Sequence, residues 1–296
     1  MKPIKTALLW HFHQPYYKLD GEFILPWVRL HGVKDYFNLP ELFHEFPKIK
    51  QTINLVPSLR MQIDEYIEGT CQDKIQRLTK IEPENLTGQD KNDILRLFFL
   101  CNPENMINPY PRYKELYERS RDRDKAAGEF SDSDWRDLQV WYNLTWLGAY
   151  SRRHSAASRL FEKGRDFSED EKNTLLEMHR YILSQIKPQM QMLQRLGQLE
   201  ISATPMYHPI LPLLCDTGSA REALPDIQLP DKQFRHPEDA EWHIKNALDY
   251  FEENISLRPE GMWPSEGSLS NEILYLLIKS GVKWAASDEE VLKNSA

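Results

Sequence analysis

Short hydrophobic runs that end close to a proline predict the first three strands of this chain. They cover residues 6–13, 51–56 and 197–203. In the first run His11 and His13 lie two positions apart, so both side chains point to the same side of the strand. Proline ends each run, because it lacks an N–H group and restricts the residue before it. We therefore expect two imidazoles to leave the end of the first strand together.

Between the second and third strands the pattern is almost wholly helical. The strongest helical segments are residues 91–100, 135–150 and 169–196. Ser168 and Glu171 have the spacing of a capping box and predict the start of the last of these helices. The block is much longer than a normal crossover, so we interpret residues 61–196 as a helical insertion over one end of the fold.

Strands and helices alternate in the rest of the chain. In order, the pattern predicts a proline-rich loop at 204–230, a helix from Pro237, a strand at 261–263, a helix at 271–279, a strand at 282–287 and a final helix. Gly281 is a typical left-handed stop for the helix before it. Ser287 and Glu290 have the spacing of a cap for the last helix.

This alternation predicts an α/β fold with a parallel sheet and right-handed crossovers. Five strands are expected, whereas a closed barrel normally needs seven or eight. We therefore expect a parallel barrel that is incomplete in this chain and carries a large helical insertion. Its parts are residues 1–60 and 197–296, which hold the barrel strands, and the insertion at 61–196, all within one catalytic domain.

Composition and charge narrow the classes of partner. The 296 residues are 41% hydrophobic and 28% charged, which is typical of a soluble globular protein. The formal net charge is −8, and the basic residues are scattered. Phosphate backbones and anionic lipids would be repelled, so we expect neither nucleic acid nor membrane as a partner.

The cysteines and the N-terminal residues bear on the compartment. Cys71, Cys101 and Cys215 show no C-x-x-C spacing, which argues against a disulfide framework and a thiolate zinc site. The hydrophobic run at 7–10 is too short for the core of a signal peptide, and no other run is long enough to span a bilayer. We expect a cytoplasmic protein.

Glu266 is the strongest candidate for a catalytic side chain. It lies at the end of the strand predicted at 261–263, where barrel enzymes place nucleophiles and acids. The simpler alternative is an acid near a helix N-terminus, worth about 0.3–1 kcal/mol. Trp263 lies three residues earlier and either stacks on a sugar face or belongs to the core. Trp135, Trp141 and Trp146 follow helical spacing and are expected in the core.

Glu200 lies on the polar side of the strand at 197–203, with Gln198 and Ser202. The hydrophobic side is expected to meet helices, which leaves the carboxylate pointing into the barrel. Burying a bare carboxylate costs several kcal/mol, so Glu200 needs a partner or a wet pocket. An internal ion pair with an arginine is the alternative to a role in binding.

His11 and His13 are candidates for metal ligands, for partners of sugar hydroxyl groups, or for a structural pair. A metal site needs a third ligand, for which Asp288, Glu200 and His208 are available. No ligand spacing repeats, so hydrogen bonding to a polyhydroxylated ligand is preferred and neither a metal nor another cofactor is predicted. The acidic pair at 288–289 is explained by the start of a helix.

Three motifs together resemble a known family. They are residues 11–15 (HFHQP), 197–201 (GQLEI) and 263–266 (WPSE), and they resemble in order and character the first three sequence signatures of glycoside hydrolase family 57. Residues 26–36 and 204–212 are also similar to its amylase-like members. The family comprises retaining enzymes that act on α-glucans, among them α-amylases, amylopullulanases, branching enzymes and 4-α-glucanotransferases.

The resemblance implies a (β/α)7 barrel and roles for particular residues. Glu266 occupies the position of the nucleophile, His11 and His13 that of a pair near the cleaved sugar, and Glu200 that of a carboxylate that binds the same ring. Further residues are expected to bind substrate: Trp27, His31, Tyr207, His208 and Trp263. No segment matches the fourth signature, which carries the aspartate that serves as acid and base. We therefore expect the N-terminal part of a longer enzyme, inactive alone.

The function expected from these observations is a retaining glycoside hydrolase or transglycosylase with an α-glucan or maltooligosaccharide as substrate. Two alternatives remain. One is a metal-dependent carbohydrate enzyme of the deacetylase or α-mannosidase type, with His11 and His13 as ligands. The other is a non-catalytic protein that binds α-glucan.

Overall fold

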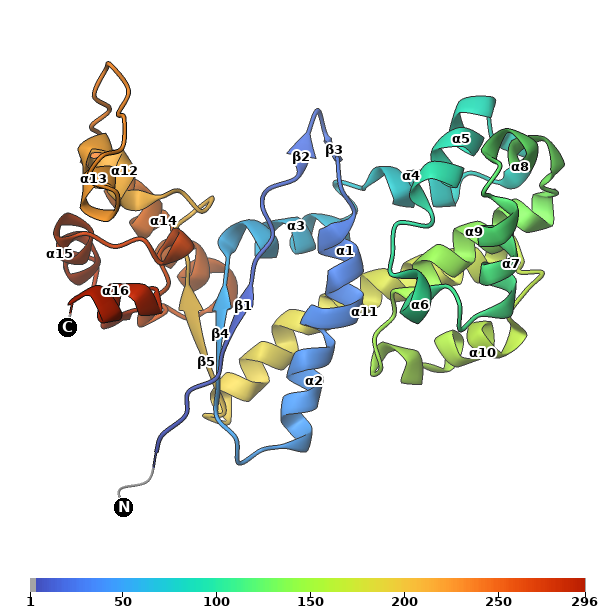
Figure 1. The fold of residues 1–296 in the computed structure, drawn as a ribbon. Coiled ribbons are helices and arrows are strands. Elements are labelled where there is room, and N and C mark those ends of the chain that lie inside the picture. Colours follow the sequence, from blue (N-terminus) through green and yellow to red (C-terminus); the bar gives the residue numbers. More distant parts are fainter. Residues whose placement is uncertain (1–3, 296) are drawn as a thin grey trace. The chain divides into compact units, whose positions relative to one another are not determined.

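The computed structural model describes residues 4–295, and five parallel strands form its sheet. The strands are β1 (Leu9–Phe12), β4 (Gln51–Leu55), β5 (Leu199–Ala203), β6 (Gly261–Met262) and β7 (Trp284–Ala285). Their order in the sheet is β1-β4-β5-β6-β7, and β1, β4 and β5 run side by side in Figure 1. The predicted parallel α/β sheet of five strands is confirmed.

Register decides which side chains share a face of the sheet. His11 of β1 lies opposite Asn54 of β4, and Asn54 lies opposite Ser202 of β5. These residues therefore form a row across one face. The strands are shorter than predicted, because β1 pairs only from Leu9 onward and β6 pairs with β5 at a single position.

The chain divides into two compact units. The first contains the sheet and comprises the chain up to residue 16, residues 46–62 and everything from residue 190 onward. Its longest helix, α14 (Pro237–Ile255), starts at the predicted proline and buries Phe251 and its hydrophobic neighbours. The helix α15 (Asn271–Lys279) has the predicted bounds and is followed by Gly281 at φ +84°.

The segment expected as a proline-rich loop at 204–230 also contains short helices. They are α12 (Leu211–Cys215), a 3₁₀ turn at Thr217–Ser219 and α13 (Ala220–Ala223). Proline stands in the first turn of α12, where its missing N–H costs no hydrogen bond. Prolines that were interpreted only as breaks thus also start a helix.

The second unit comprises residues 17–45 and 63–189 and is mainly helical, as predicted for the segment between the second and third strands of the sheet. A hairpin of β2 (Lys18–Leu19) and β3 (Glu22–Phe23) precedes the helices. The helical elements are α1 (Trp27–His31), a π-helical turn (Gly32–Tyr36), α2 (Asn38–Glu45), α3 (Pro57–Glu68), α4 (Lys74–Lys80), a 3₁₀ turn (Pro83–Asn85), α5 (Gly88–Leu97), α6 (Pro103–Met106), α7 (Pro111–Arg119), α8 (Arg123–Glu129), α9 (Asp132–Thr145), a 3₁₀ turn (Ser151–Arg153), α10 (Ser155–Lys163) and α11 (Glu169–Arg195). The first residues of α3 and the last of α11 belong to the first unit.

Capping boxes decide where three of these helices begin. The predicted pair of Ser168 and Glu171 is confirmed, with both reciprocal hydrogen bonds present at the start of α11. The helices α5 and α9 begin three residues earlier than predicted, because Thr87 and Ser131 form capping boxes with an aspartate at the third helical position. Aspartate is shorter than the usual glutamate or glutamine but makes the same two contacts.

Charged side chains lie inside the helical unit and join its elements. The Arg29 guanidinium donates to both Asp73 oxygens, at 2.7 and 3.3 Å, and to Asn143 at 2.8 Å. It also donates to Nδ1 of His179 at 3.1 Å, and because a guanidinium cannot accept, His179 carries its proton on Nε2. Burial, with the Arg29 charge, holds the pKa of His179 well below its ordinary value, so this ring is neutral.

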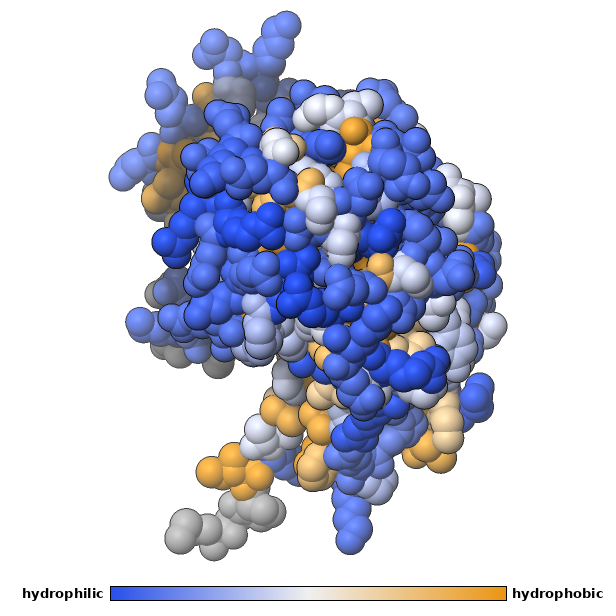
Figure 2. Space-filling model, turned by 90° about the vertical axis from the view of Figure 1, so that its right-hand side faces the viewer, coloured by the Kyte–Doolittle hydropathy of each residue, from blue (hydrophilic) through white to orange (hydrophobic). Residues whose placement is uncertain are grey.

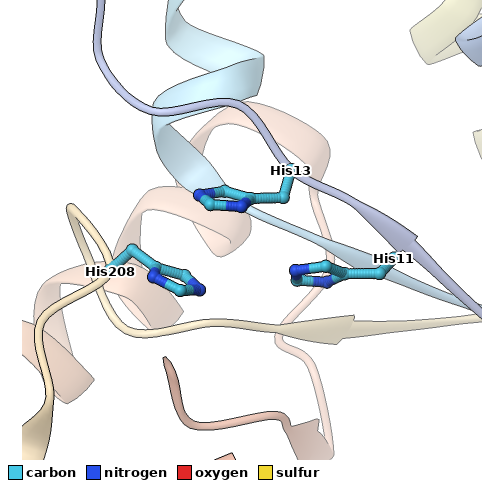
Figure 3. A group of neighbouring side chains, drawn as sticks. All are labelled: His11, His13 and His208. Carbon is cyan, nitrogen blue, oxygen red and sulfur yellow. The ribbon is translucent and has the colours of Figure 1, made fainter. Parts of the chain in front are cut away.

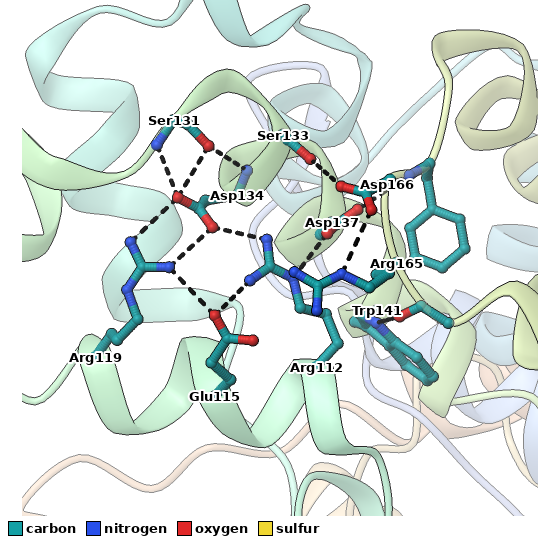
Figure 4. Close-up of polar contacts among 12 residues, drawn as sticks. Arg112, Glu115, Arg119, Ser131, Ser133, Asp134, Asp137, Trp141, Arg165 and Asp166 are labelled. Atoms are coloured by element: carbon teal, nitrogen blue, oxygen red, sulfur yellow. Dashed lines mark hydrogen bonds and ion pairs between the residues drawn. The ribbon is translucent and has the colours of Figure 1, made fainter.

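A second ionic cluster joins α7 to α9 (Figure 4). Arg112 donates to Asp134 at 2.7 Å and to Asp137 at 2.8 Å, and Arg119 donates to Asp134 at 2.9 Å. The predicted core tryptophans lie around α9 as well, with Trp135, Trp141 and Trp146 buried. The helical unit thus combines hydrophobic packing with paired charges. The charges are paired because burying a charged group without a partner is costly.

Polar residues dominate the face of the molecule that Figure 2 shows, and hydrophobic residues form only small groups there. Within residues 4–295, no helix combines the length and the hydrophobicity needed to cross a bilayer. The three cysteines are free thiols.

Candidate functional site

A cavity of about 440 Å³ opens at the carboxyl ends of the strands. Its lining residues come from the ends of β1, β5, β6 and β7: His11, His13, His208, Trp263, Pro264, Glu266, Gly267, Ser287, Asp288 and Glu289. Parallel strands bring their carboxyl ends to one edge of a sheet, which is where barrel enzymes form their sites. Five of the residues predicted from the sequence meet here, namely His11, His13, His208, Trp263 and Glu266.

Asn54 sets the orientation of the His11 ring. Its side-chain NH₂ group donates to the Ala203 carbonyl at 3.0 Å, and a carbonyl can only accept, so Oδ1 of Asn54 faces the other way. Oδ1 lies 2.7 Å from Nδ1 of His11 and also accepts from the Thr204 hydroxyl at 2.9 Å. His11 Nδ1 therefore carries a proton, so in the neutral ring Nε2 is the acceptor. The sequence pattern gave no sign of this role for Asn54, because it depends on register.

Three imidazoles converge on one space (Figure 3). One ring nitrogen from each of His11, His13 and His208 lies within 4.8 Å of the others. The rings of His13 and His208 stack with centroids 4.2 Å apart. Burial, together with the neighbouring His208 and His11, lowers the pKa of His13 to about 4. Burial also lowers the pKa of His208, against the opposing effect of the Glu266 carboxylate. These two rings are therefore neutral at neutral pH.

The backbone is strained at the site. Tyr207, His208 and Glu266 have φ of +58°, +62° and +54°, in the left-handed region that residues with a side chain rarely adopt. Such residues cost about 1–3 kcal/mol each and persist only where the surroundings hold them. His208 and Glu266 therefore have a strained backbone and also line the cavity.

Two neighbouring loops are joined behind Glu266. The Ser287 hydroxyl donates to the Gly267 carbonyl at 3.0 Å. A Cβ at Gly267 would lie 3.0 Å from the Asp288 nitrogen, which is tighter than most Cβ contacts, and the φ of +66° also favours glycine there. The prediction that Ser287 caps the last helix is wrong, because Asp288 accepts from the Glu290 N–H at 2.8 Å before α16 (Glu289–Ser295).

Asp288 and Glu289 were explained from the sequence as a helix start, yet both line the cavity. With Glu266 they bring three carboxyl groups to its wall. Their position after the last strand was the available signal, since that strand ends at the same edge of the sheet as the others. Glu266 itself is exposed and lies in a 3₁₀ turn, and α15 begins only after Ser270, which caps it.

Glu200 is not among the residues that line the cavity. Its Oε1 accepts from the indole N–H of Trp284 at 2.8 Å, and the side chain is exposed. The Trp284 ring reaches it by lying over Gly261, where an added Cβ would be 2.0 Å from the ring. The partner of Glu200 is therefore an indole, and the alternative of an internal ion pair with an arginine is not what the structure shows.

The other predicted binding residues lie outside the cavity lining. Tyr207 is 49% exposed, and its ring meets the edge of Tyr16 with centroids 6.1 Å apart. Trp27 and His31 belong to the helical unit. Both rings pack against Trp146, with centroids 5.9 and 5.3 Å away. His31 also makes a 2.6 Å contact with Asp35, one helical turn later.

Comparisons with known proteins bear on this site. A family model described as "Glycosyl hydrolase family 57" matches residues 7–296. Among solved structures, the alpha-amylase AmyC from Thermotoga maritima shares 13% identity over 94% of this chain and 38% of its own, with a TM-score of 0.48. Two GH57 branching enzymes are also similar to this chain, both with a TM-score of 0.44. The enzyme from Thermococcus kodakaraensis, solved with glucose and additives, shares 15% identity over 94% of this chain and 38% of its own. The enzyme from Pyrococcus horikoshii shares 16% identity over 94% of this chain and 41% of its own.

The chain spans about two fifths of the length of these solved chains. A comparison with curated protein sequences gave no match. The family model, in contrast, covers nearly every residue from the first strand to the last helix, including all the residues that line the cavity. The chain therefore belongs to glycosyl hydrolase family 57.

Proposed function

We propose that this chain carries the nucleophile of a retaining enzyme that cleaves or transfers α-glucans, and that Glu266 is this nucleophile. Membership of the family supports the class of reaction. The observation that carries the assignment is the shared cavity, in which Glu266 meets His11, His13 and His208 at the carboxyl ends of parallel strands. Its volume of about 440 Å³ is within the range of small-molecule sites.

In the first step the Glu266 carboxylate attacks the anomeric carbon, and the bond to the leaving glycosidic oxygen breaks as that oxygen takes a proton. The product is a covalent glycosyl-enzyme. In the second step an acceptor oxygen attacks the same carbon, loses its proton and releases Glu266. Water as acceptor gives hydrolysis, and a second glucan gives transfer. We assign the proton donor to no residue of this chain.

The remaining cavity residues have roles that follow from their chemistry. Nε2 of His11 can accept a hydrogen bond from a sugar hydroxyl group, because its Nδ1 proton is committed to Asn54. Trp263 is half-buried beside His11, with ring centroids 4.8 Å apart, and offers a surface for a sugar ring. Asp288 and Glu289 add negative charge, which favours the positive charge that develops on the sugar during cleavage.

Replacement of the nucleophile tests the proposal. We expect Glu266→Gln in the intact protein to lower kcat on a maltooligosaccharide by about 10³-fold or more, because no covalent intermediate can form. A 5-fluoroglycosyl fluoride of the α-gluco series should label the wild-type protein, and peptide mass analysis should locate the label on Glu266. The matched control is Glu253→Gln, an exposed glutamate of α14 outside the cavity, which we expect to keep full activity.

The same experiment separates the alternatives. Turnover that survives in Glu266→Gln and disappears with a zinc chelator indicates the metal-dependent carbohydrate enzyme. Maltooligosaccharide binding without turnover in the wild-type protein indicates the non-catalytic α-glucan-binding protein. Either result removes Glu266 as the nucleophile.

A further inference from the structure

We propose that the helical unit carries a second saccharide-binding site, formed by two adjoining hollows along α11, and that a linear α-glucan occupies both. The first, the polar hollow, is lined by the end of α3 and the loop after it, by α4 and by α11. The second, the aromatic hollow, is lined by α3, the start of α10 and α11. Neither shares a lining residue with the cavity at Glu266. The choice of an α-glucan as ligand rests on the proposed function.

The two hollows meet at an ion pair. Each has a volume of about 470 Å³, within the range of small-molecule sites, and Glu177 and Arg180 line both. Arg180 donates through Nε to Glu177 at 3.1 Å and reaches the Ile67 carbonyl at 3.4 Å. These contacts hold two planar side chains at the boundary. A ligand that crosses the boundary therefore meets groups that are already ordered, which favours binding.

The polar hollow offers both donors and acceptors. Lys80 donates to Oε1 of Gln72 at 3.0 Å, which leaves the NH₂ group of Gln72 as a donor. The Thr70 hydroxyl donates to the Glu65 carbonyl at 3.4 Å, so its oxygen is left as an acceptor. Oε1 of Gln76 is buried and has no hydrogen-bond partner in the described part of the chain, so a donor from a ligand would stabilise it. Sugar hydroxyl groups both donate and accept, which matches this lining.

The charges at the polar hollow favour a neutral ligand over a phosphorylated one. Its charged lining residues are Lys80, Glu177 and Arg180. Arg180 is paired with Glu177 at 3.0 Å, which leaves the exposed Lys80 as the excess charge. Phosphate groups are typically bound by a bidentate arginine or by several cations. The arginine here is already engaged by a carboxylate, so a neutral sugar fits the hollow better.

The aromatic hollow supplies a stacking surface. Tyr181 is 54% exposed, and its ring lies beside His154, with centroids 6.0 Å apart. Nδ1 of His154 accepts from the Ala156 N–H at 3.3 Å, so in the neutral ring Nε2 is a donor. Met178 adds a hydrophobic side chain to the lining. One face of a sugar ring consists largely of C–H groups, which pack on an aromatic ring, while its hydroxyl groups reach polar neighbours.

A linear saccharide combines the two kinds of surface in one ligand. Its hydroxyl groups suit the polar hollow, and its ring faces suit Tyr181 in the aromatic hollow. A single sugar fills one hollow, whereas an oligosaccharide can cross the boundary at Glu177 and Arg180. A glucan polymer offers many such segments, so a second site raises the avidity of the protein for the polymer.

Photoaffinity labelling tests the proposal. The probe is maltoheptaose with a diazirine at its reducing end, and peptide mass analysis of the intact protein locates the label. We expect label on peptides that contain residues 66–80 and 174–184. Tyr181→Ala should reduce the labelling of these peptides about fivefold or more, because the stacking surface is lost. Tyr181→Phe should keep it, because the ring remains.

The matched control is Tyr275→Ala, which removes a 66% exposed tyrosine of α15 outside both hollows and should be labelled like the wild type. Circular dichroism checks that the variants fold, and Tyr181→Gln serves in place of alanine if needed, because glutamine suits a helix. Label confined to peptides of the cavity, or equal labelling of the two hollows in Tyr181→Ala and wild type, overturns the second site. The activity of Glu266→Gln is measured separately, so failure of the nucleophile is distinguished from failure of this site.

Discussion

Single atoms decide the fit between Gly261, Trp284 and Glu200. The Trp284 ring occupies the space that a Cβ at position 261 would need, at 2.0 Å, and its N–H reaches the Glu200 carboxylate at 2.8 Å. A glycine in a strand weakens it unless another group approaches closely, and here an indole does. The absence of a side chain at Gly261 therefore allows Trp284 to reach Glu200, and the three residues lie on neighbouring strands.

We expect Gly261→Ala to displace the Trp284 ring and to break its hydrogen bond to Glu200. The cost in the free energy of unfolding should be about 1–3 kcal/mol, as for overpacking elsewhere. Urea denaturation and tryptophan fluorescence measure both effects. The control is Gly128→Ala in α8, where an added Cβ meets no atom within 4 Å, and we expect it to be neutral or slightly stabilising. Equal stability of the two variants would contradict this account.

At the scale of elements, caps set the helix boundaries that periodicity misses. The hydrophobic pattern predicted the second insertion helix from residue 135, whereas α9 begins at Asp132 because Ser131 and Asp134 exchange hydrogen bonds. The first turn of α9 is polar, so it adds nothing to a hydrophobic repeat. Its start is instead encoded by two side chains three residues apart.

We expect Ser131→Ala to lower the free energy of unfolding by about 0.5–2 kcal/mol, because it removes the acceptor for the Asp134 N–H. Ser133→Ala is the matched control in the same turn, since its hydroxyl contacts only an exposed Asp166 at 3.0 Å (Figure 4). Chemical denaturation of both variants measures the difference. A loss in Ser133→Ala as large as that in Ser131→Ala would show that the cap is not the cause.

At the scale of the whole molecule, paired carboxylates make the stability of the helical unit depend on pH. Burial raises the pKa of Asp134, but hydrogen bonds from Arg119, Ser131 and Arg112 outweigh it and hold the pKa well below the usual range. Burial also raises the pKa of Asp93, but hydrogen bonds from Lys74, Gln89 and Arg96 outweigh this effect and lower the pKa to about 2. A lowered pKa in the folded state means that these groups stabilise the fold above the unfolded pKa of about 3.9.

We therefore expect the stability of the helical unit to fall as the pH drops from about 5 toward 2, when these carboxylates become protonated. Asp134→Asn should be less stable than wild type at pH 7 and should show a smaller loss over this range. The control is Asp132→Asn, which replaces an exposed carboxylate two residues before Asp134. Thermal denaturation at several pH values measures the slopes, and parallel curves for Asp134→Asn and wild type would rule out this cause.

Local patterns in the sequence determined the type and order of most elements, although not all of their bounds. The alternation of strands and helices, the bounds of α15, the capping box of α11 and the place of Glu266 at a strand end all follow from short-range periodicity and from proline and glycine. These features depend on residues close together in the chain, so a single sequence carries them. Family resemblance then added an expected role to Glu266.

Only the tertiary structure decided which side chains meet. His208 joins His11 and His13, Asp288 and Glu289 join Glu266, and Glu200 turns to Trp284 instead of the cavity. Each of these meetings brings together residues far apart in the chain. They depend on strand register, on the left-handed backbone of loop residues and on the space left by glycine, and no local repeat of hydrophobic and polar positions encodes those quantities.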